Sequence, residues 1–327
     1  MLHAELLCHL LTETLSSLSA ANGGHPMAIP WPEMVGAPYL LNELLALAAT
    51  HLSIIRPPTQ RTWYRYHAKQ LQTHAVRSFQ TTTTTGEKAT DPAASTPARF
   101  LFSSILGLHM LCETLIFREG NFTVFFDAFI HYLRLQQGVR AVIGGQWRAL
   151  TMNPRFGPAL GAAEAQLQQG SPRDESGSYS HHHDEHNLLL ERACNDLLTR
   201  IGQAKLGAAV TATHRHAIEA LQLAVHASAS FPSSESSSSS VPYPGVTSTI
   251  GVFAWPASIS TGFIDLLALR SPDALVVLAH YGVLLHAHRR QWFLSDGGQY
   301  LIESIRVYLG PDWSEWMAFS SQSLGEG

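Results

Sequence analysis

The sequence contains few charged residues. Only 14% of the 327 residues are charged while 45% are hydrophobic, whereas a typical globular domain has roughly 25% charged residues. The net charge of −4 and the pI of about 6.5 show no basic excess. Direct binding to nucleic acid is therefore not expected, because proteins that bind the phosphate backbone usually carry a basic face. A surface with so little charge leaves room for a covered area, such as a homodimer interface.

Cysteines and targeting signals are also scarce. Cys8, Cys112 and Cys194 lie far apart, which fits neither a disulfide framework nor a zinc site. The first segment has no basic n-region and carries Glu5 and Glu13, so it predicts an amphipathic helix and not a signal peptide. No uninterrupted apolar run reaches about 18 residues, so we expect no membrane span. A reducing, cytoplasmic location follows from this pattern.

The common catalytic motifs are missing. We find no glycine-rich phosphate loop, nucleophile elbow or HExxH motif, and we expect no cofactor and no metal. The tract HHHDEH (181–186) could attract transition metals, but it lies in a Ser/Gly/Asp-rich linker and is interpreted as a solvated loop. Asn195, Thr199 and Gln203 have the spacing of a terpene-cyclase magnesium triad, yet Gln203 is a neutral ligand, and a solvated helix face is the simpler interpretation.

Helical periodicity dominates what is present. Strand patterns are nearly absent, and only VTSTIGVFAW (246–255) looks extended. The sequence therefore predicts an all-α protein, a single large helical domain over 1–327 with about ten helices. Low-complexity or Ser/Gly-rich composition predicts three mobile insertions, at 81–97, 169–187 and 229–248.

One predicted helix, 272–290, carries polar residues within an apolar sequence. Ser271 is a good N-cap, Pro272 suits the first turn, and the histidines and arginines at the other end suit a helix C-terminus. His280 and Tyr281, however, lie in the middle. A buried imidazole or phenol needs a hydrogen-bond partner. Either each one bonds a neighbouring helix, or one of them faces a ligand pocket.

Several segments together resemble a known family. In the last third these are VFAWPASISTGFIDLL (252–267), RSPDALVVLAHYGVLLHAHRRQW (270–292) and LIESIRVYLGPDWSEWM (301–317). Earlier segments are LHAELLCHLLTETLSSL (2–18), PYLLNELLALAATHLSIIRP (38–57), YRYHAKQLQTHAVRSF (64–79) and FIHYLRLQQGVRAV (129–142). In this order they resemble the C-terminal regulatory domain of fungal zinc-cluster transcription factors of the sterol-uptake-control type.

The resemblance implies an all-helical domain around an internal hydrophobic pocket for a sterol-like ligand. Two features depart from the family pattern. No Cys-x₂-Cys pair or basic helix precedes Leu2, and Phe319-Ser320 stand where the family tends to have Trp-Pro after a Trp-x-x-Trp stretch.

Three functions stay open from these observations. The preferred hypothesis, based on the missing DNA-binding module, is a cofactor-free biosynthetic enzyme of fungal secondary metabolism. It would catalyse a pericyclic, Diels–Alder-type cyclisation of a terpenoid, sterol-like or polyketide substrate, mainly by orienting it. The alternatives are a ligand-sensing transcription regulator, which would be nuclear, and a carrier of hydrophobic molecules. Candidate catalytic residues, each able to provide a hydrogen bond, are His109, His131, His280 and Tyr281. Candidate ligand-binding residues are Met110, Phe126, Trp255, Phe263, Leu284 and Trp292.

Overall fold

The computed structural model describes residues 1–21, 31–84, 92–118, 120–144, 181–228 and 249–325. Within these ranges the secondary structure is helical and contains no strand, which confirms the predicted all-α class. The chain divides into two compact units. Unit 1 contains residues 1–20, 24–111 and 138–161, and unit 2 contains 21–23, 112–137 and 162–327.

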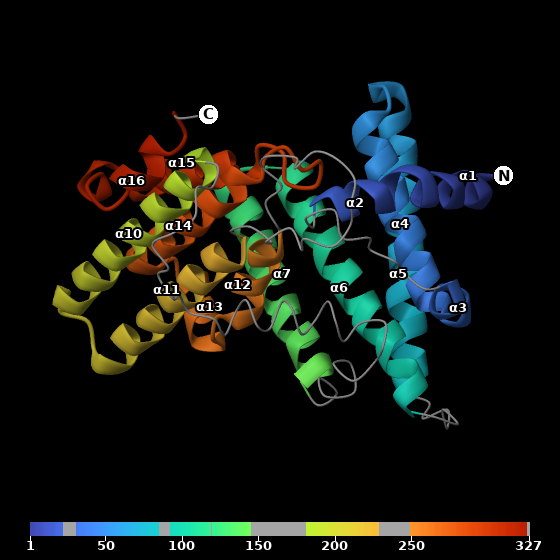
Figure 1. Cartoon of the computed structure of the whole chain (residues 1–327), viewed down its shortest axis with the longest axis horizontal. Coiled ribbons are helices and arrows are strands. Elements are labelled where there is room, and N and C mark those ends of the chain that lie inside the picture. Colours follow the sequence, from blue (N-terminus) through green and yellow to red (C-terminus); the bar gives the residue numbers. More distant parts are fainter. Residues whose placement is uncertain (22–30, 85–91, 119, 145–180, 229–248, 326–327) are drawn as a thin grey trace. The chain divides into compact units, whose positions relative to one another are not determined.

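Unit 1 is built on the antiparallel pair α4 (Pro38–Ile55) and α5 (Pro58–Thr84), which lie side by side in Figure 1. Pro38 opens α4, and Arg56 is extended because it precedes a proline. Four elements precede this pair in the chain: α1 (Leu2–His9), a π-helical turn η1 (Leu10–Thr14), α2 (Leu15–Ala21) and α3 (Trp31–Gly36). The first part of α6 (Pro92–Ile116) also belongs to unit 1. Leu6 of α1 packs on α4 and α5 in one core cluster, with Leu45, Ala46, Ala49, Leu52, Tyr64, Ala68 and Leu71.

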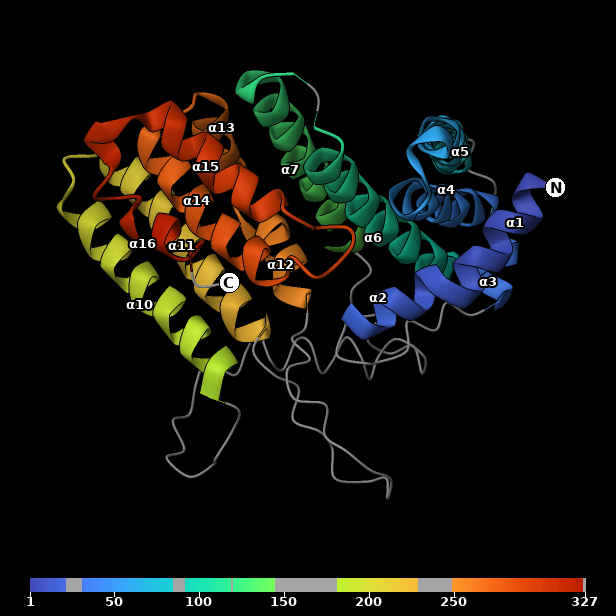
Figure 2. The same cartoon turned by 90° about the horizontal axis from the view of Figure 1, so that it is seen from above.

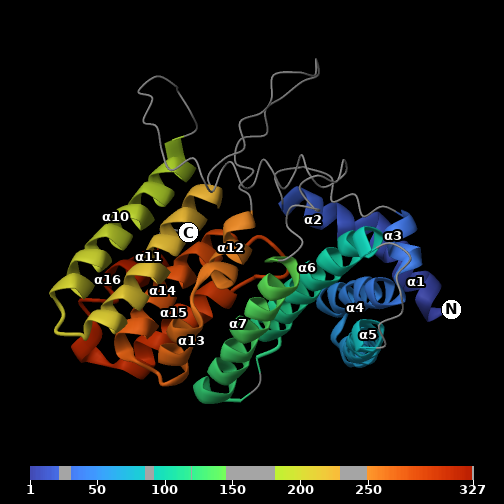
Figure 3. The same ribbon diagram turned by 90° about the horizontal axis from the view of Figure 1, so that it is seen from below.

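Unit 2 is arranged around α14 (Pro272–Ala287), whose residues from Ala274 to His286 are all buried. The neighbours of α14 are α10 (His181–Gln203), α11 (Ala208–Ser228), α12 (Ile250–Ser258), α13 (Thr261–Ala268), α15 (Gly297–Leu309) and α16 (Ala318–Gln322). Figure 2 shows α10, α11, α14 and α15 side by side, and Figure 3 shows the same set from the opposite side. The start of α7 (Phe122–Gly144) and a short 3₁₀ turn, η2 (Pro311–Trp313), also belong to this unit.

The expected extended segment at 246–255 is wrong for its described part, because residues from Ile250 onward form α12. Gly251 permits this helix to pack closely on α11, since a Cβ at that position would collide with the carbonyl of Ala224 and the hydroxyl of Ser228. Tertiary packing therefore overrides the β-propensity of the branched residues. A bend of 89° separates α12 from α13, and the Ser260 side chain caps α13 by accepting from the Phe263 amide.

Helices also reach into two of the predicted insertions. α5 continues to Thr84 and α6 begins at Pro92, inside 81–97, and α10 begins at His181, inside 169–187. The predicted insertion at 229–248 lies outside the described residues. So do residues 85–91 of the first insertion and 169–180 of the second.

Two helical stretches, Pro38–Ile55 and Pro97–Ile116, are long and apolar enough to cross a membrane by length and composition. The sequence expectation of no membrane span is therefore not confirmed on these criteria. Both stretches are mostly buried within the protein, with 72% and 61% of their respective windows covered. Their apolar character is thus largely used in packing against other helices.

Candidate functional site

A pocket of about 310 Å³ in unit 2 lies between α10, α14 and the C-terminal segment. Its apolar wall comes from Leu189, Ala193, Leu197, Trp316, Ala318 and Phe319. Its polar lining consists of Arg192, Asp196, Arg200, His280, Glu315 and Gln322. Apolar and polar side chains thus contribute equally to the lining. The volume lies at the lower end of the range for small-molecule sites, roughly 300–1,000 Å³.

His280 is the most deeply placed polar group of this pocket, with only 3% of its surface exposed. Its Nδ1 lies 2.9 Å from the Val276 carbonyl, which can only accept, so Nδ1 carries the proton. Burial lowers the pKa of His280 to about 4, and the ring is therefore neutral at pH 7. Its Nε2 is then an acceptor, and it has no hydrogen-bond partner among the described residues.

The C-terminal segment holds His280 from the other side. The Phe319 ring stacks on the imidazole with 5.7 Å between centroids, and the Ser320 hydroxyl lies 3.4 Å from Nδ1. Their contact with His280 was not predicted, since 40 residues separate Ser320 from His280.

One edge of the pocket is held by an ion pair between α10 and the C-terminal segment. Arg200 lies 3.1 Å from the Glu315 carboxylate, and its guanidinium also lies over the Trp316 ring at 5.5 Å. Arg192, also on α10, is exposed and makes no ion pair with another described residue. The neighbouring Asn195 accepts a hydrogen bond from Gln222 of α11.

Tyr281 has a structural partner. Its hydroxyl donates to the Val252 carbonyl at 2.7 Å, and its ring stacks on Trp255 at 4.3 Å between centroids. In a regular helix the Val252 carbonyl would accept from residue 256, but Pro256 has no N–H. Tyr281 thus satisfies a carbonyl that the proline leaves free. Burial raises the pKa of Tyr281 well above its ordinary value.

His109 lies in unit 1, in a buried polar network with Glu43, Thr50 and Gln72. Its Nδ1 is 2.8 Å from the Glu43 carboxylate, and its Nε2 is 2.7 Å from the Thr50 hydroxyl. The amide nitrogen of Gln72 lies 3.1 Å from Nδ1. The order hydroxyl, imidazole, carboxylate is that of an activated nucleophile. Thr50 and Glu43 are both 0% exposed, however, so a substrate has no access and a structural role is the simpler interpretation.

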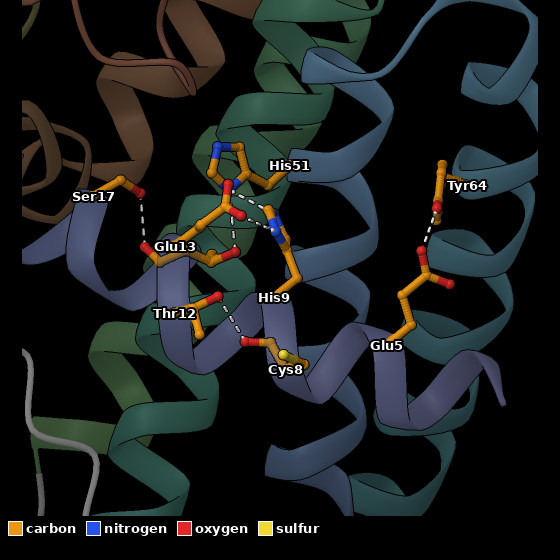
Figure 4. Close-up of polar contacts among 9 residues, drawn as sticks. Glu5, Cys8, His9, Thr12, Glu13, Ser17, His51 and Tyr64 are labelled. Atoms are coloured by element: carbon orange, nitrogen blue, oxygen red, sulfur yellow. Dashed lines mark hydrogen bonds and ion pairs between the residues drawn. The ribbon is translucent and has the colours of Figure 1, made fainter.

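A second polar network joins the N-terminal segment to α4 (Figure 4). The His9 and His51 rings point toward one another, with 3.2 Å between Nε2 and Nδ1. The Thr14 hydroxyl lies 3.1 Å from the same His51 nitrogen, and Glu13 lies 3.5 Å from His9. Burial, and then the nearby His9, lower the pKa of His51 to about 4. This network includes the π-helical turn, a conformation often found at functional sites.

Of the remaining predicted residues, Trp255 and Phe263 are brought together, with 6.1 Å between their ring centroids. His131 is exposed on α7. Trp255, Phe263, Phe126 and Leu284 are buried in the core of unit 2 with at most 1% exposure. The indole N–H of Trp255 donates to the Ala217 carbonyl. Trp292 and Met110 are half-buried, the latter in unit 1. His280 is the predicted residue that lines the pocket of unit 2.

The described residues hold no group of three or more His, Cys, Asp or Glu side chains that could bind a metal ion. The side chains of the HHHDEH tract lie outside the described part. Comparisons with protein-family models, with curated proteins and with solved structures found no match.

Proposed function

We propose that the chain binds a small hydrophobic alcohol, of the terpenoid or sterol-like class, in the pocket of unit 2. The observation that carries this proposal is the state of His280. A neutral imidazole, fixed by Val276, lines this pocket and keeps its Nε2 as a hydrogen-bond acceptor. A hydroxyl group is the complementary donor, and the apolar wall suits a hydrocarbon body.

The same observation bears on the choice between an enzyme and a sensor. A cyclisation assisted by a hydrogen bond needs a donor that polarises the substrate. None of the four predicted catalytic residues offers a donor to this pocket. Nε2 of His280 is an acceptor, the Tyr281 hydroxyl already donates to Val252, His109 is bonded to Glu43 and Thr50, and His131 is not among the lining residues. Binding alone requires none of these to donate. We therefore favour a ligand-binding, sensor-type role over the pericyclic enzyme, in line with the resemblance to a regulatory domain.

A matched pair of ligands tests this proposal. Borneol and camphor share one carbon skeleton and differ in having a hydroxyl or a ketone. We expect borneol to bind more tightly by about fivefold to tenfold, as one net hydrogen bond of about 1 kcal/mol implies. The measurement is quenching of tryptophan fluorescence, since Trp316 lines the pocket, with titration calorimetry as a check.

The variant His280→Leu should lose the preference for the alcohol, because it removes the acceptor. His131→Leu is the control, since it removes an exposed imidazole elsewhere in the chain. Tighter binding of camphor, or no binding of either compound by the wild-type protein, would contradict the proposal. Conversion of a linear precursor by the protein alone would restore the enzyme hypothesis.

A further inference from the structure

A second pocket, in unit 1, has a different chemistry. It has a volume of about 500 Å³ and lies between the N-terminal helix, α4 and α5. Its lining is His3, Asn42, His67, Gln70, Thr73, His74 and Arg77, together with Leu2 and Leu71. Three imidazoles and a guanidinium therefore surround this space, and none of the lining residues is an aspartate or a glutamate.

The polarity of α5 extends this observation. Its 27 residues include three arginines and one lysine but no acidic residue. His67, Gln70, His74 and Arg77 follow one another at spacings of three and four, which places them along one face of the helix. α5 is thus a rigid support for a row of donors, because its opposite face is buried against α4 in the core of unit 1.

Four of the donors that line the pocket are available. His3, Gln70, His74 and Arg77 make no side-chain hydrogen bond or ion pair to another described residue, and all four are exposed. The neutral groups are partly used. The Asn42 amide donates to the Pro38 carbonyl, and the Thr73 hydroxyl donates to the Lys69 carbonyl, which leaves the Thr73 oxygen as an acceptor. The lining therefore combines one guanidinium and three imidazoles with amide and hydroxyl groups.

We propose that this pocket binds a phosphate group carried by a polar, hydroxyl-bearing molecule. Arg77 and the imidazoles of His67 and His74 would contact the phosphate, since a guanidinium matches phosphate oxygens in a bidentate way. Gln70, Thr73 and Asn42 would contact the hydroxyls. The pocket differs from that of unit 2 in having no acidic side chain in its lining, whereas Asp196 and Glu315 line the pocket of unit 2. The two proposals are independent.

Titration calorimetry of the full chain with glucose 6-phosphate, and with glucose as the uncharged counterpart, tests the proposal. We expect binding of the phosphate ester and not of glucose. Arg77→Gln and His74→Gln should each weaken binding by about tenfold, as loss of a charge-assisted hydrogen bond implies. Lys69→Gln is the matched control. It removes one charge from the same helix at an exposed position outside the pocket lining, and it should change the affinity less than twofold.

A second arm separates the two sources of such a phosphate. Phosphatidylcholine vesicles with and without phosphatidylinositol 4-phosphate present it on a membrane surface. Binding to the phosphorylated vesicles, sensitive to Arg77→Gln, would support the site with a lipid headgroup as the ligand. Binding of neither glucose 6-phosphate nor these vesicles would overturn the proposal. Equal losses in Arg77→Gln and Lys69→Gln would also overturn it, because they would indicate attraction by net charge and not a site. Circular dichroism verifies that each variant is folded.

Discussion

The contact between Tyr281 and the Val252 carbonyl leads to a quantitative prediction about folding. Tyr281→Phe keeps the ring, and with it the stack on Trp255, but removes the hydroxyl that donates at 2.7 Å. The carbonyl would remain buried without a partner, since Pro256 has no N–H to offer it. An unpaired buried polar group costs about 1–3 kcal/mol. We expect the free energy of unfolding to fall by that amount.

Pro256→Ala provides the decisive background. Alanine supplies the N–H that the regular helix would direct at the Val252 carbonyl, so the tyrosine hydroxyl is no longer its sole partner. In this background Tyr281→Phe should cost at most about 1 kcal/mol, the net value of an ordinary hydrogen bond. The double-mutant cycle should therefore show a coupling energy of up to about 2 kcal/mol between the two positions.

Urea unfolding followed by circular dichroism measures these free energies, and hydrogen exchange of α12 amides localises the effect. Tyr308→Phe is the control, because that ring is 48% exposed and its change should stay within about 0.5 kcal/mol. If Tyr281→Phe costs the same with proline or alanine at position 256, the tyrosine does not compensate for the proline and the reasoning is wrong.

Three further predictions concern other buried groups. Burial lowers the pKa of His280 in the folded state to about 4, whereas in the unfolded state it is about 6.5. The folded state therefore binds this proton only at a lower pH, and the free energy of unfolding should fall by about 3 kcal/mol between pH 6.5 and 4. His280→Gln should flatten this decline, as measured by urea midpoints across the pH range. His109→Ala should lower the free energy of unfolding by about 3–5 kcal/mol, because it leaves the Glu43 carboxylate buried without its partner. Adding Glu43→Gln should recover part of this stability. A loss below about 1 kcal/mol in urea unfolding would contradict the pairing. Gly298→Ala should cost about 1–3 kcal/mol, because its Cβ would lie 2.6 Å from the Gly282 carbonyl at the crossing of α14 and α15; an unchanged melting temperature would show that this crossing is loose.

Much of the helical architecture was predictable from local features of the sequence. Pro38 and Pro57 delimit α4, and Pro272 with Asp273 marks the start of α14. These signals act within a few residues, through fixed proline geometry and the helix dipole, so they survive changes of tertiary context. The extended appearance of 246–255 was misleading because the helix there depends on Gly251 meeting α11, a contact between distant residues.

The sequence by itself also identified two polar residues whose burial requires hydrogen-bond partners. His280 and Tyr281 are unusual in any apolar helix, and the pattern predicted that each needs a partner. Only the tertiary structure decided which partners they have. The Tyr281 hydroxyl donates to a carbonyl that Pro256, 25 positions earlier in the chain, leaves without its helical partner. His280 bonds the Val276 carbonyl and lines a pocket together with Phe319 and Trp316. Adjacent residues on a helix point about 100° apart, so their different surroundings, and hence their different roles, arise only when the other helices have packed around them.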